Sequence, residues 1–76
     1  MNQNALKILG NRIREKRKSL GWTQEDLADI AGIDRSYIGS VERGKRNLTF
    51  TVLCQIASAL RIDVAFLAKG IPEIVK

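Results

Sequence analysis

Polar side chains recur at helical spacing in the middle of the chain, and they carry hydrogen-bond donors. They are Arg35, Ser36, Tyr37, Ser40 and Arg43. Ser36, Ser40 and Arg43 are separated by four and three residues, so a helix places them on one face. Ile38 and Val41 point to the other side, as core residues would. The pattern predicts a short helix that buries one face and offers hydrogen-bonding groups on the other.

Hydrogen bonds to the edges of DNA bases are the chemistry that these groups suit best. An arginine can donate two hydrogen bonds to O6 and N7 of guanine, worth about 1–3 kcal/mol of discrimination. Arg35 lies in the first turn, which leads into the major groove when such a helix docks, and is the first candidate for a base contact. Ser36 and Ser40 are weaker, more versatile readers. Tyr37 offers a hydroxyl and a ring for a thymine methyl group, and Gly39 would let the backbone approach DNA.

Each of these residues also has an ordinary structural explanation. Arg35 could be a solvated arginine at a helix N-terminus, and Ser40 an exposed residue without a role. Tyr37 could pack at the edge of the core as readily as contact a ligand. The DNA-binding interpretation therefore depends on a scaffold that presents this helix.

The net charge of +5 is unevenly distributed along the 76 residues. One basic cluster, at the end of the first predicted helix, comprises Arg12, Arg14, Lys16, Arg17 and Lys18. A second cluster, after the polar helix, comprises Arg43, Lys45 and Arg46. Two basic clusters beside a candidate reading helix are typical of a protein that binds a polyanion. A merely solvated basic surface would have the same composition.

Catalytic and metal-binding chemistry is not expected. The sequence has no histidine, its one cysteine (Cys54) lies in an apolar stretch, and no paired carboxylates share an obvious cleft. We therefore expect no enzyme activity, no catalytic residue, no metal ligand and no cofactor. A membrane-surface domain is disfavoured because the basic first helix lacks an aromatic face.

The sequence also predicts where in the cell the protein is located. A single cysteine leaves no internal disulfide, which fits a reducing compartment. The start of the chain lacks the apolar core of a signal peptide, and no apolar run approaches the ~20 residues of a membrane span. A cytoplasmic protein without membrane contact is expected.

One local pattern recurs at four places: an apolar residue, a capping residue, and a second apolar residue five positions after the first. The capping residues are Thr23, Asp34, Thr49 and Asp63. This combination of N-cap and hydrophobic staple predicts helices over residues 24–31, 35–43, 50–60 and 64–69. Apolar residues at near-helical spacing predict another helix over residues 4–18. No segment alternates with period two, so we expect an all-α, compact five-helix bundle.

The apolar faces of these helices predict the core. Its members are Leu9, Ile13, Leu20, Leu27, Ala31, Ile33, Ile38, Val41, Leu53, Ile56, Ala57, Leu60 and Leu67. Gly10, inside the first helix, costs about 1 kcal/mol relative to alanine and would make the early turns mobile.

The run TQEDLADIAGIDRSYIGSVERGKRN, followed by LTFTVLCQIASAL, resembles the Cro/cI-type (XRE-like) helix-turn-helix family of phage and bacterial regulators. The resemblance covers nearly the whole chain, and the pattern Q-x-x-L-A-x-x-A-G with a later I-x-x-V-E-x-G is specific. Within the family, DRSYIGSVERGKRNLT is similar to the controller proteins of restriction–modification systems. The resemblance implies one lambda-repressor-like DNA-binding domain over residues 1–76.

Carried over position by position, the resemblance assigns roles to individual residues. The base-reading candidates, taken with the spacing argument, are Arg35, Ser36, Tyr37 and Ser40. The candidates for the DNA phosphates and groove edge are Thr23, Gln24, Arg43, Arg46 and Asn47. The resemblance also pairs Arg17 with Glu42 as a structural ion pair joining the first and third helices.

A homodimer on a palindromic operator in double-stranded DNA is expected, because one short helix reads few base pairs; the half-sites would lie about 34–36 Å apart. The C-terminal helices have apolar residues beyond the needs of one core, and the interface candidates are Val52, Ile62, Val64 and Phe66. The tail residues Ile71, Ile74 and Val75 could join this surface or fold over their own core.

The resemblance implies a sequence-specific transcriptional regulator, a controller protein that activates and autoregulates its operon as a dimer. Activation implies contact with RNA polymerase, for which acidic residues such as Asp29 are candidates. The alternative is a phage or mobile-element Cro/cI-like repressor. Serine and tyrosine tolerate several base partners, and sequence-dependent DNA shape adds specificity beyond the base contacts.

Overall fold

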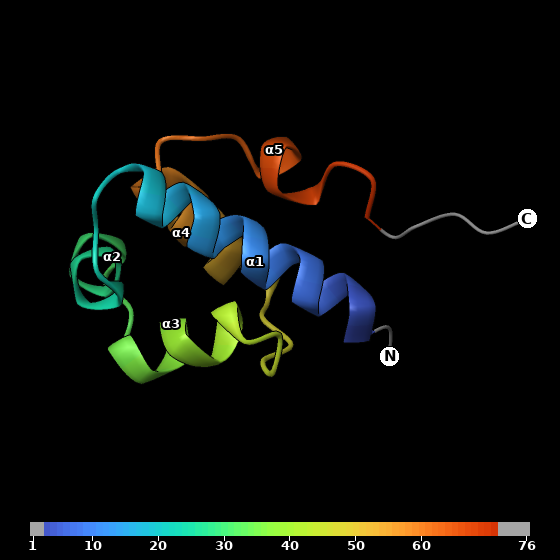
Figure 1. Cartoon of the computed structure of the whole chain (residues 1–76), viewed down its shortest axis with the longest axis horizontal. Helices are drawn as coiled ribbons and strands as arrows, with labels where there is room; N and C mark the ends of the chain where they lie inside the picture. Colours follow the sequence, from blue (N-terminus) through green and yellow to red (C-terminus); the bar gives the residue numbers. More distant parts are fainter. Residues whose placement is uncertain (1–2, 72–76) are drawn as a thin grey trace, which may run out of the picture.

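The computed structural model describes residues 3–71. The five helices are α1 (Gln3–Ser19), α2 (Gln24–Ala31), α3 (Arg35–Glu42), α4 (Phe50–Ala59) and α5 (Val64–Ala68). No strand occurs between residues 3 and 71, so the predicted all-α class is confirmed. Helix α1 crosses the molecule, with α3 packed on one side of it and α5 on the other, while α4 lies behind (Figure 1). Helix α2 packs on α3 and α4.

Side-chain caps start the three central helices where the local pattern predicts them. The Thr23 hydroxyl accepts a hydrogen bond from the Asp26 backbone at 3.0 Å, and the Asp26 carboxylate accepts one from the Thr23 backbone at 2.9 Å. Asp34 caps α3 and Thr49 caps α4, accepting from backbone N–H groups at 3.1 and 3.2 Å. Asp63 makes no side-chain cap, although α5 begins directly after it. Each of these three caps joins residues that are at most three positions apart in sequence. A short stretch of sequence therefore determines where each of these helices begins.

The core lies where α1, α2, α3 and α4 meet, and α5 closes one end of it. Its buried apolar residues are Ile13, Leu27, Ala28, Ile38, Val41, Ile56, Ala57, Ala59, Leu60 and Leu67. Leu9, Ala31, Ile33 and Leu53 are partly buried against it. Leu20 was predicted as a core residue, and this is wrong, because its side chain is 38% exposed. Since α1 ends at Ser19, Leu20 lies in a turn and no longer follows the apolar face of the helix.

Gly10 has a packing role that its sequence position does not reveal. It is buried, and a Cβ atom built on it would lie 2.3 Å from the Val41 carbonyl oxygen and 2.8 Å from that of Glu42. Helix α1 therefore approaches the end of α3 at a distance that only glycine allows. The close packing offsets the helix-propensity cost of about 1 kcal/mol.

Among the helices within residues 3–71, none combines the length and the hydropathy that crossing a membrane requires.

Candidate nucleic-acid interface

Helices α2 and α3 form a helix-turn-helix whose second helix lies along one edge of the molecule (Figure 1). Gly32 ends α2 in the left-handed conformation, with φ 70° and ψ 34°, which glycine adopts without strain. Two residues later Asp34 starts α3. Ile38 and Val41 are 0% and 2% exposed, so they anchor α3 on the core. The opposite face of α3 remains available for a ligand.

A buried ion pair locks α3 against α1. The Arg17 guanidinium donates two hydrogen bonds to the Glu42 carboxylate, at 2.7 Å from Nε and 2.9 Å from Nη2. A third hydrogen bond, 2.7 Å long, joins Arg17 Nη1 to the Trp22 carbonyl oxygen. The two side chains are 9% and 2% exposed. The hydrogen bonds to Glu42 raise the pKa of Arg17 above its ordinary value, against the opposing effect of burial.

Gln24 at the start of α2 is connected to the same carboxylate. Its Nε2 atom donates to Glu42 Oε1 at 3.1 Å, which orients the amide and leaves its second N–H free. The adjacent Thr23 is exposed and uses its oxygen to cap α2. Both residues therefore sit at a helix N-terminus, where backbone N–H groups favour an anion.

The two serine hydroxyls of α3 already have hydrogen-bond partners within the chain. The Ser36 hydroxyl donates to Asp34 Oδ2, and the Ser36 backbone donates to the same oxygen at 3.1 Å. These hydrogen bonds, the hydroxyl's first, lower the pKa of Asp34 below its ordinary value. The Ser40 hydroxyl accepts a long hydrogen bond of 3.4 Å from Arg43 Nη2. Arg35 is exposed at the start of the helix.

Gly39 is buried, so it does not present open backbone. A Cβ atom built on Gly39 would lie 3.3 Å from Arg43 Nη1 and 3.4 Å from Gln24 Oε1. The ends of these two flexible side chains occupy the space beside Gly39. A close approach of DNA to this backbone would require them to move.

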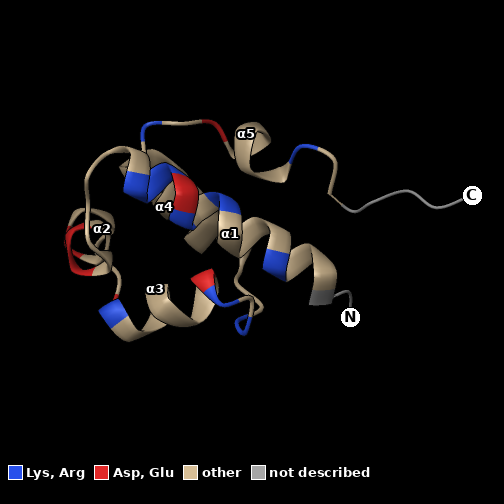
Figure 2. Ribbon diagram, viewed as in Figure 1, with Lys and Arg blue, Asp and Glu red and all other residues tan. Residues whose placement is uncertain are grey.

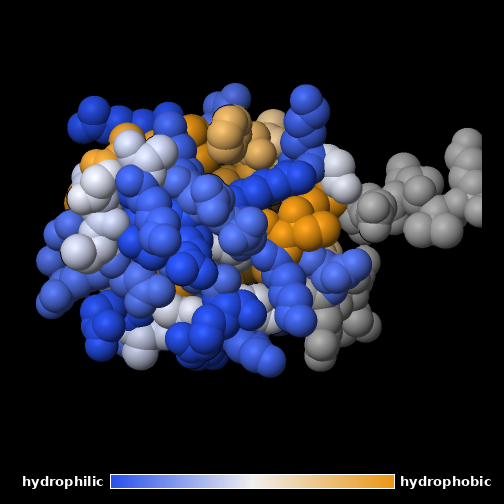
Figure 3. All heavy atoms as spheres, viewed as in Figure 1, coloured by the Kyte–Doolittle hydropathy of each residue, from blue (hydrophilic) through white to orange (hydrophobic). Residues whose placement is uncertain are grey.

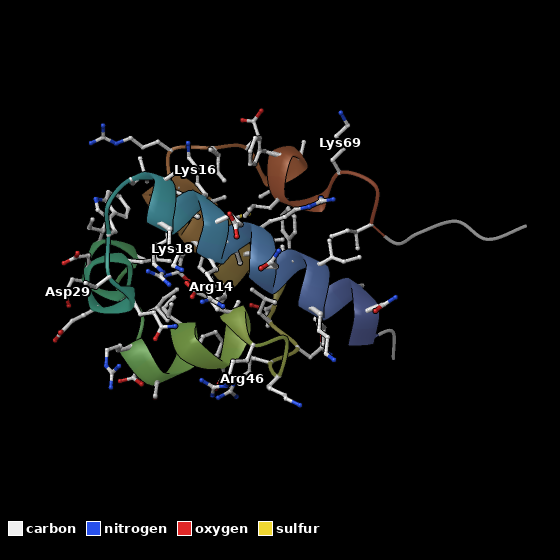
Figure 4. All side chains as sticks on the ribbon, viewed as in Figure 1. Arg14, Lys16, Lys18, Asp29, Arg46 and Lys69 are labelled. Atoms are coloured by element: carbon white, nitrogen blue, oxygen red, sulfur yellow. The ribbon has the colours of Figure 1, made fainter. Side chains whose placement is uncertain are left out.

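Tyr37 on α3 contacts Arg46 in the loop that follows the helix. The Arg46 guanidinium carbon lies 4.5 Å from the centre of the Tyr37 ring, the geometry of a cation–π contact. The ring also packs against the core, which makes Tyr37 partly buried. Figure 4 shows Arg46 beside the outer edge of α3. Asn47 is exposed in the same loop.

Part of the basic cluster on α1 is structural. The Arg12 guanidinium donates to the carbonyl oxygen of Leu67, at 3.0 Å, and to that of Lys69, so it holds the end of α5. Arg17 forms the buried ion pair with Glu42. Arg14 and Lys18 remain exposed. Figure 2 shows the basic residues on α1, at the start of α3 and in the loop after it, and acidic residues on α2.

The four candidate interface residues differ in exposure. Phe66 is 58% exposed, whereas Val52, Ile62 and Val64 are partly buried against the core of their own chain. Sequence reasoning missed Phe50, which is 70% exposed at the start of α4. Apolar surface is visible around α5 and beside the first turns of α1 (Figure 3). Ile71 is partly buried, and Ile74 and Val75 lie outside the described residues.

A short helix anchored by its apolar face, locked by a buried ion pair and preceded by a glycine turn, defines a helix-turn-helix protein. The chain belongs to the helix-turn-helix family HTH_3, whose model matches residues 13–67. The fold and family implied by the sequence motifs are therefore confirmed.

Three of the proteins to which the chain is similar are named control or controller proteins. The chain is 46% identical over 57 residues to the control protein C.SmaI of Serratia marcescens, covering 75% of this chain and 68% of that protein. It is similar to the crystal structure of the restriction–modification controller protein C.AhdI from Aeromonas hydrophila, with a TM-score of 0.80 and 45% identity, covering 82% of this chain and 94% of that one. The wild-type controller protein C.Esp1396I gives a TM-score of 0.78 and 39% identity, covering 93% of this chain and 96% of that one.

Proposed function

We propose that this protein is a restriction–modification controller that binds a palindromic operator as a homodimer and regulates transcription of its own operon. The observation that carries the proposal is the exposed face of α3, with Arg35 at its leading end, held rigidly on the core. The similarity to three controller proteins along most of the chain supports the same conclusion.

Specificity would reside in the first turn and outer face of α3. We infer that Arg35 reads a guanine, because its guanidinium is exposed at the leading end of the helix. Ser36, Tyr37 and Ser40 are the further candidates for base contacts. Ser36 and Ser40 would exchange their present partners, Asp34 and Arg43, for base edges.

Affinity would come from groups that flank α3. The candidates for the DNA backbone are Thr23, Gln24, Arg43, Arg46 and Asn47. Gln24 is the best supported, because Glu42 orients its amide and a free N–H remains for a phosphate oxygen. Such contacts bind all sequences alike, so they set the salt dependence of binding rather than its specificity.

Dimerisation would double the readout on a twofold-symmetric operator. Among the interface candidates Phe66 has the largest exposed fraction, and Val64 is the first residue of the same helix, α5. Val52 and Ile62 would contribute the parts of their side chains that the core leaves open. We propose that the helix-turn-helix domain and this C-terminal interface form one unit over residues 1–76.

Activation, as opposed to repression alone, would require a surface for RNA polymerase. Asp29 is exposed on α2 and points away from the body of the molecule (Figure 4). An Asp29→Asn variant that binds the operator normally but no longer stimulates transcription in vitro would support this contact. Repression without stimulation by the wild-type protein would instead favour the Cro/cI-like repressor.

The decisive experiment is selection of bound duplexes from a random pool at a stated salt concentration. A recovered palindrome with half-sites about 34–36 Å apart is expected, and a matching site upstream of the gene would establish autoregulation. Recovery of DNA without any sequence preference would refute the proposal.

A further inference from the structure

We propose that Tyr37 is a positioning residue, whose ring holds the Arg46 guanidinium at one flank of α3 for contact with DNA. The inference rests on the proposed DNA-binding function. It replaces direct base reading by the Tyr37 ring with a supporting role, and it makes Tyr37 and Arg46 one functional unit.

Part of the Tyr37 ring already has neighbours within the chain. Tyr37 packs partly against the core, and the Arg46 guanidinium carbon lies over the ring at 4.5 Å from its centre. A thymine methyl group that approached this face of the ring would have to displace Arg46. The hydroxyl at the tip of the ring could still contact DNA directly.

Arg46 gains such a support from outside its own segment, which has no regular secondary structure. Residues 45–49 form neither helix nor strand, and Arg46 is exposed. Stacking holds a guanidinium by its flat face and leaves the N–H groups at its edge free to donate. Since immobilising a flexible side chain on binding costs conformational entropy, a side chain ordered beforehand binds more tightly.

The Tyr37–Arg46 pair lies on one flank of α3, and a second cation lies on the other flank. Successive helical residues are rotated by about 100°, so Tyr37 and Gly39 lie on opposite flanks of α3, with Ser36 and Ser40 between them. Arg43 and Gln24 cover the Gly39 flank, and Arg46 covers the Tyr37 flank. A cation on each flank of a helix in the major groove faces the phosphates of a different strand.

A double-mutant cycle on the selected duplex tests the coupling. Tyr37→Leu should lower affinity about two- to fivefold, which is the ~0.5–1 kcal/mol of an exposed cation–π contact converted at 1.4 kcal/mol per tenfold. In an Arg46→Ala background the same change should have no effect, because the guanidinium is already gone. The matched control is Arg43→Ala, whose effect should multiply with that of Tyr37→Leu, since Arg43 contacts Ser40 and not the ring.

Two further measurements separate positioning from direct contact and from loss of structure. Tyr37→Phe keeps the ring and removes only the hydroxyl, so it should lose less affinity than Tyr37→Leu, whereas a loss equal to that of Tyr37→Leu would assign the role to the hydroxyl and overturn the proposal. The slope of log affinity against log salt should stay unchanged in Tyr37→Leu and fall by about 1 in Arg46→Ala, because only the second variant loses a charge.

The stack itself can be seen without DNA. In the free protein the Arg46 side-chain protons should show an upfield ring-current shift in NMR spectra of the wild type and Tyr37→Phe, and lose it in Tyr37→Leu. Absence of the shift in the wild type, or full affinity of a folded Tyr37→Leu variant, would overturn the inference alone. Failure of the wild type to select any duplex would overturn the proposed function first, and the role of Tyr37 with it.

Discussion

Breaking the Arg17–Glu42 pair should remove much of the stability of this protein. Glu42→Leu would leave the Arg17 guanidinium buried without the carboxylate that now accepts its bonds of 2.7 and 2.9 Å. Removing one partner of a buried ion pair costs ~3–5 kcal/mol. For 76 residues the whole free energy of unfolding is about 4–11 kcal/mol, at ~0.05–0.15 kcal/mol per residue. The variant should therefore be marginally folded at room temperature.

Urea unfolding followed by circular dichroism measures this loss. Replacing both partners, as in Arg17→Met with Glu42→Leu, should recover most of the stability. Two apolar side chains of similar size can pack against each other, and no unpaired charge remains buried. The exposed residues Arg14 and Glu15 on α1 offer matched controls, and Arg14→Met or Glu15→Leu should cost less than about 0.5 kcal/mol.

Two results would refute this reasoning. A loss below about 1 kcal/mol in Glu42→Leu would mean that the pair is effectively solvated. A double variant as unstable as the sum of the single variants would mean that the two residues do not interact energetically.

The remaining predictions concern α1, the α3 cap, the reading face and the C-terminal surface. Gly10→Ala should destabilise the fold by ~1–3 kcal/mol in the same urea assay, because its Cβ atom would lie 2.3 Å from a carbonyl oxygen; unchanged stability would show that α1 can shift away from α3. The pKa of Asp34 is lowered in the folded state, so its contribution to stability is present above the ordinary carboxyl value of about 3.9 and is lost as the pH falls through the folded value. Asp34→Asn should accordingly flatten the acid limb of the stability curve, and an identical limb would refute the role of this cap. Arg35→Ala should reduce discrimination at one base position by about 1–3 kcal/mol in competition binding, and a uniform loss across all duplexes would contradict base reading. Phe66→Ser should shift sedimentation equilibrium toward the monomer, whereas an unaltered dimer would place the interface elsewhere.

Local chemistry made the helices predictable from sequence. Thr23, Asp34 and Thr49 cap helices that begin at the next residue, as the staple pattern predicts. The predicted and observed ends differ by one residue for α1, α3, α4 and α5, because fraying at the last turn depends on packing. Caps and staples act over three to five positions along one chain, so their information is contained in short sequence windows.

The roles of several side chains depended on how the helices and loops pack together. Arg12 belongs by composition to a basic cluster, yet it holds a carbonyl oxygen 55 residues away. Leu20 continues an apolar pattern past the end of its helix and becomes exposed. Tyr37 contacts Arg46, which lies in a loop without any periodic pattern. Such contacts depend on the angles and distances at which helices pack, and neither quantity is expressed in the spacing of residue types along the chain.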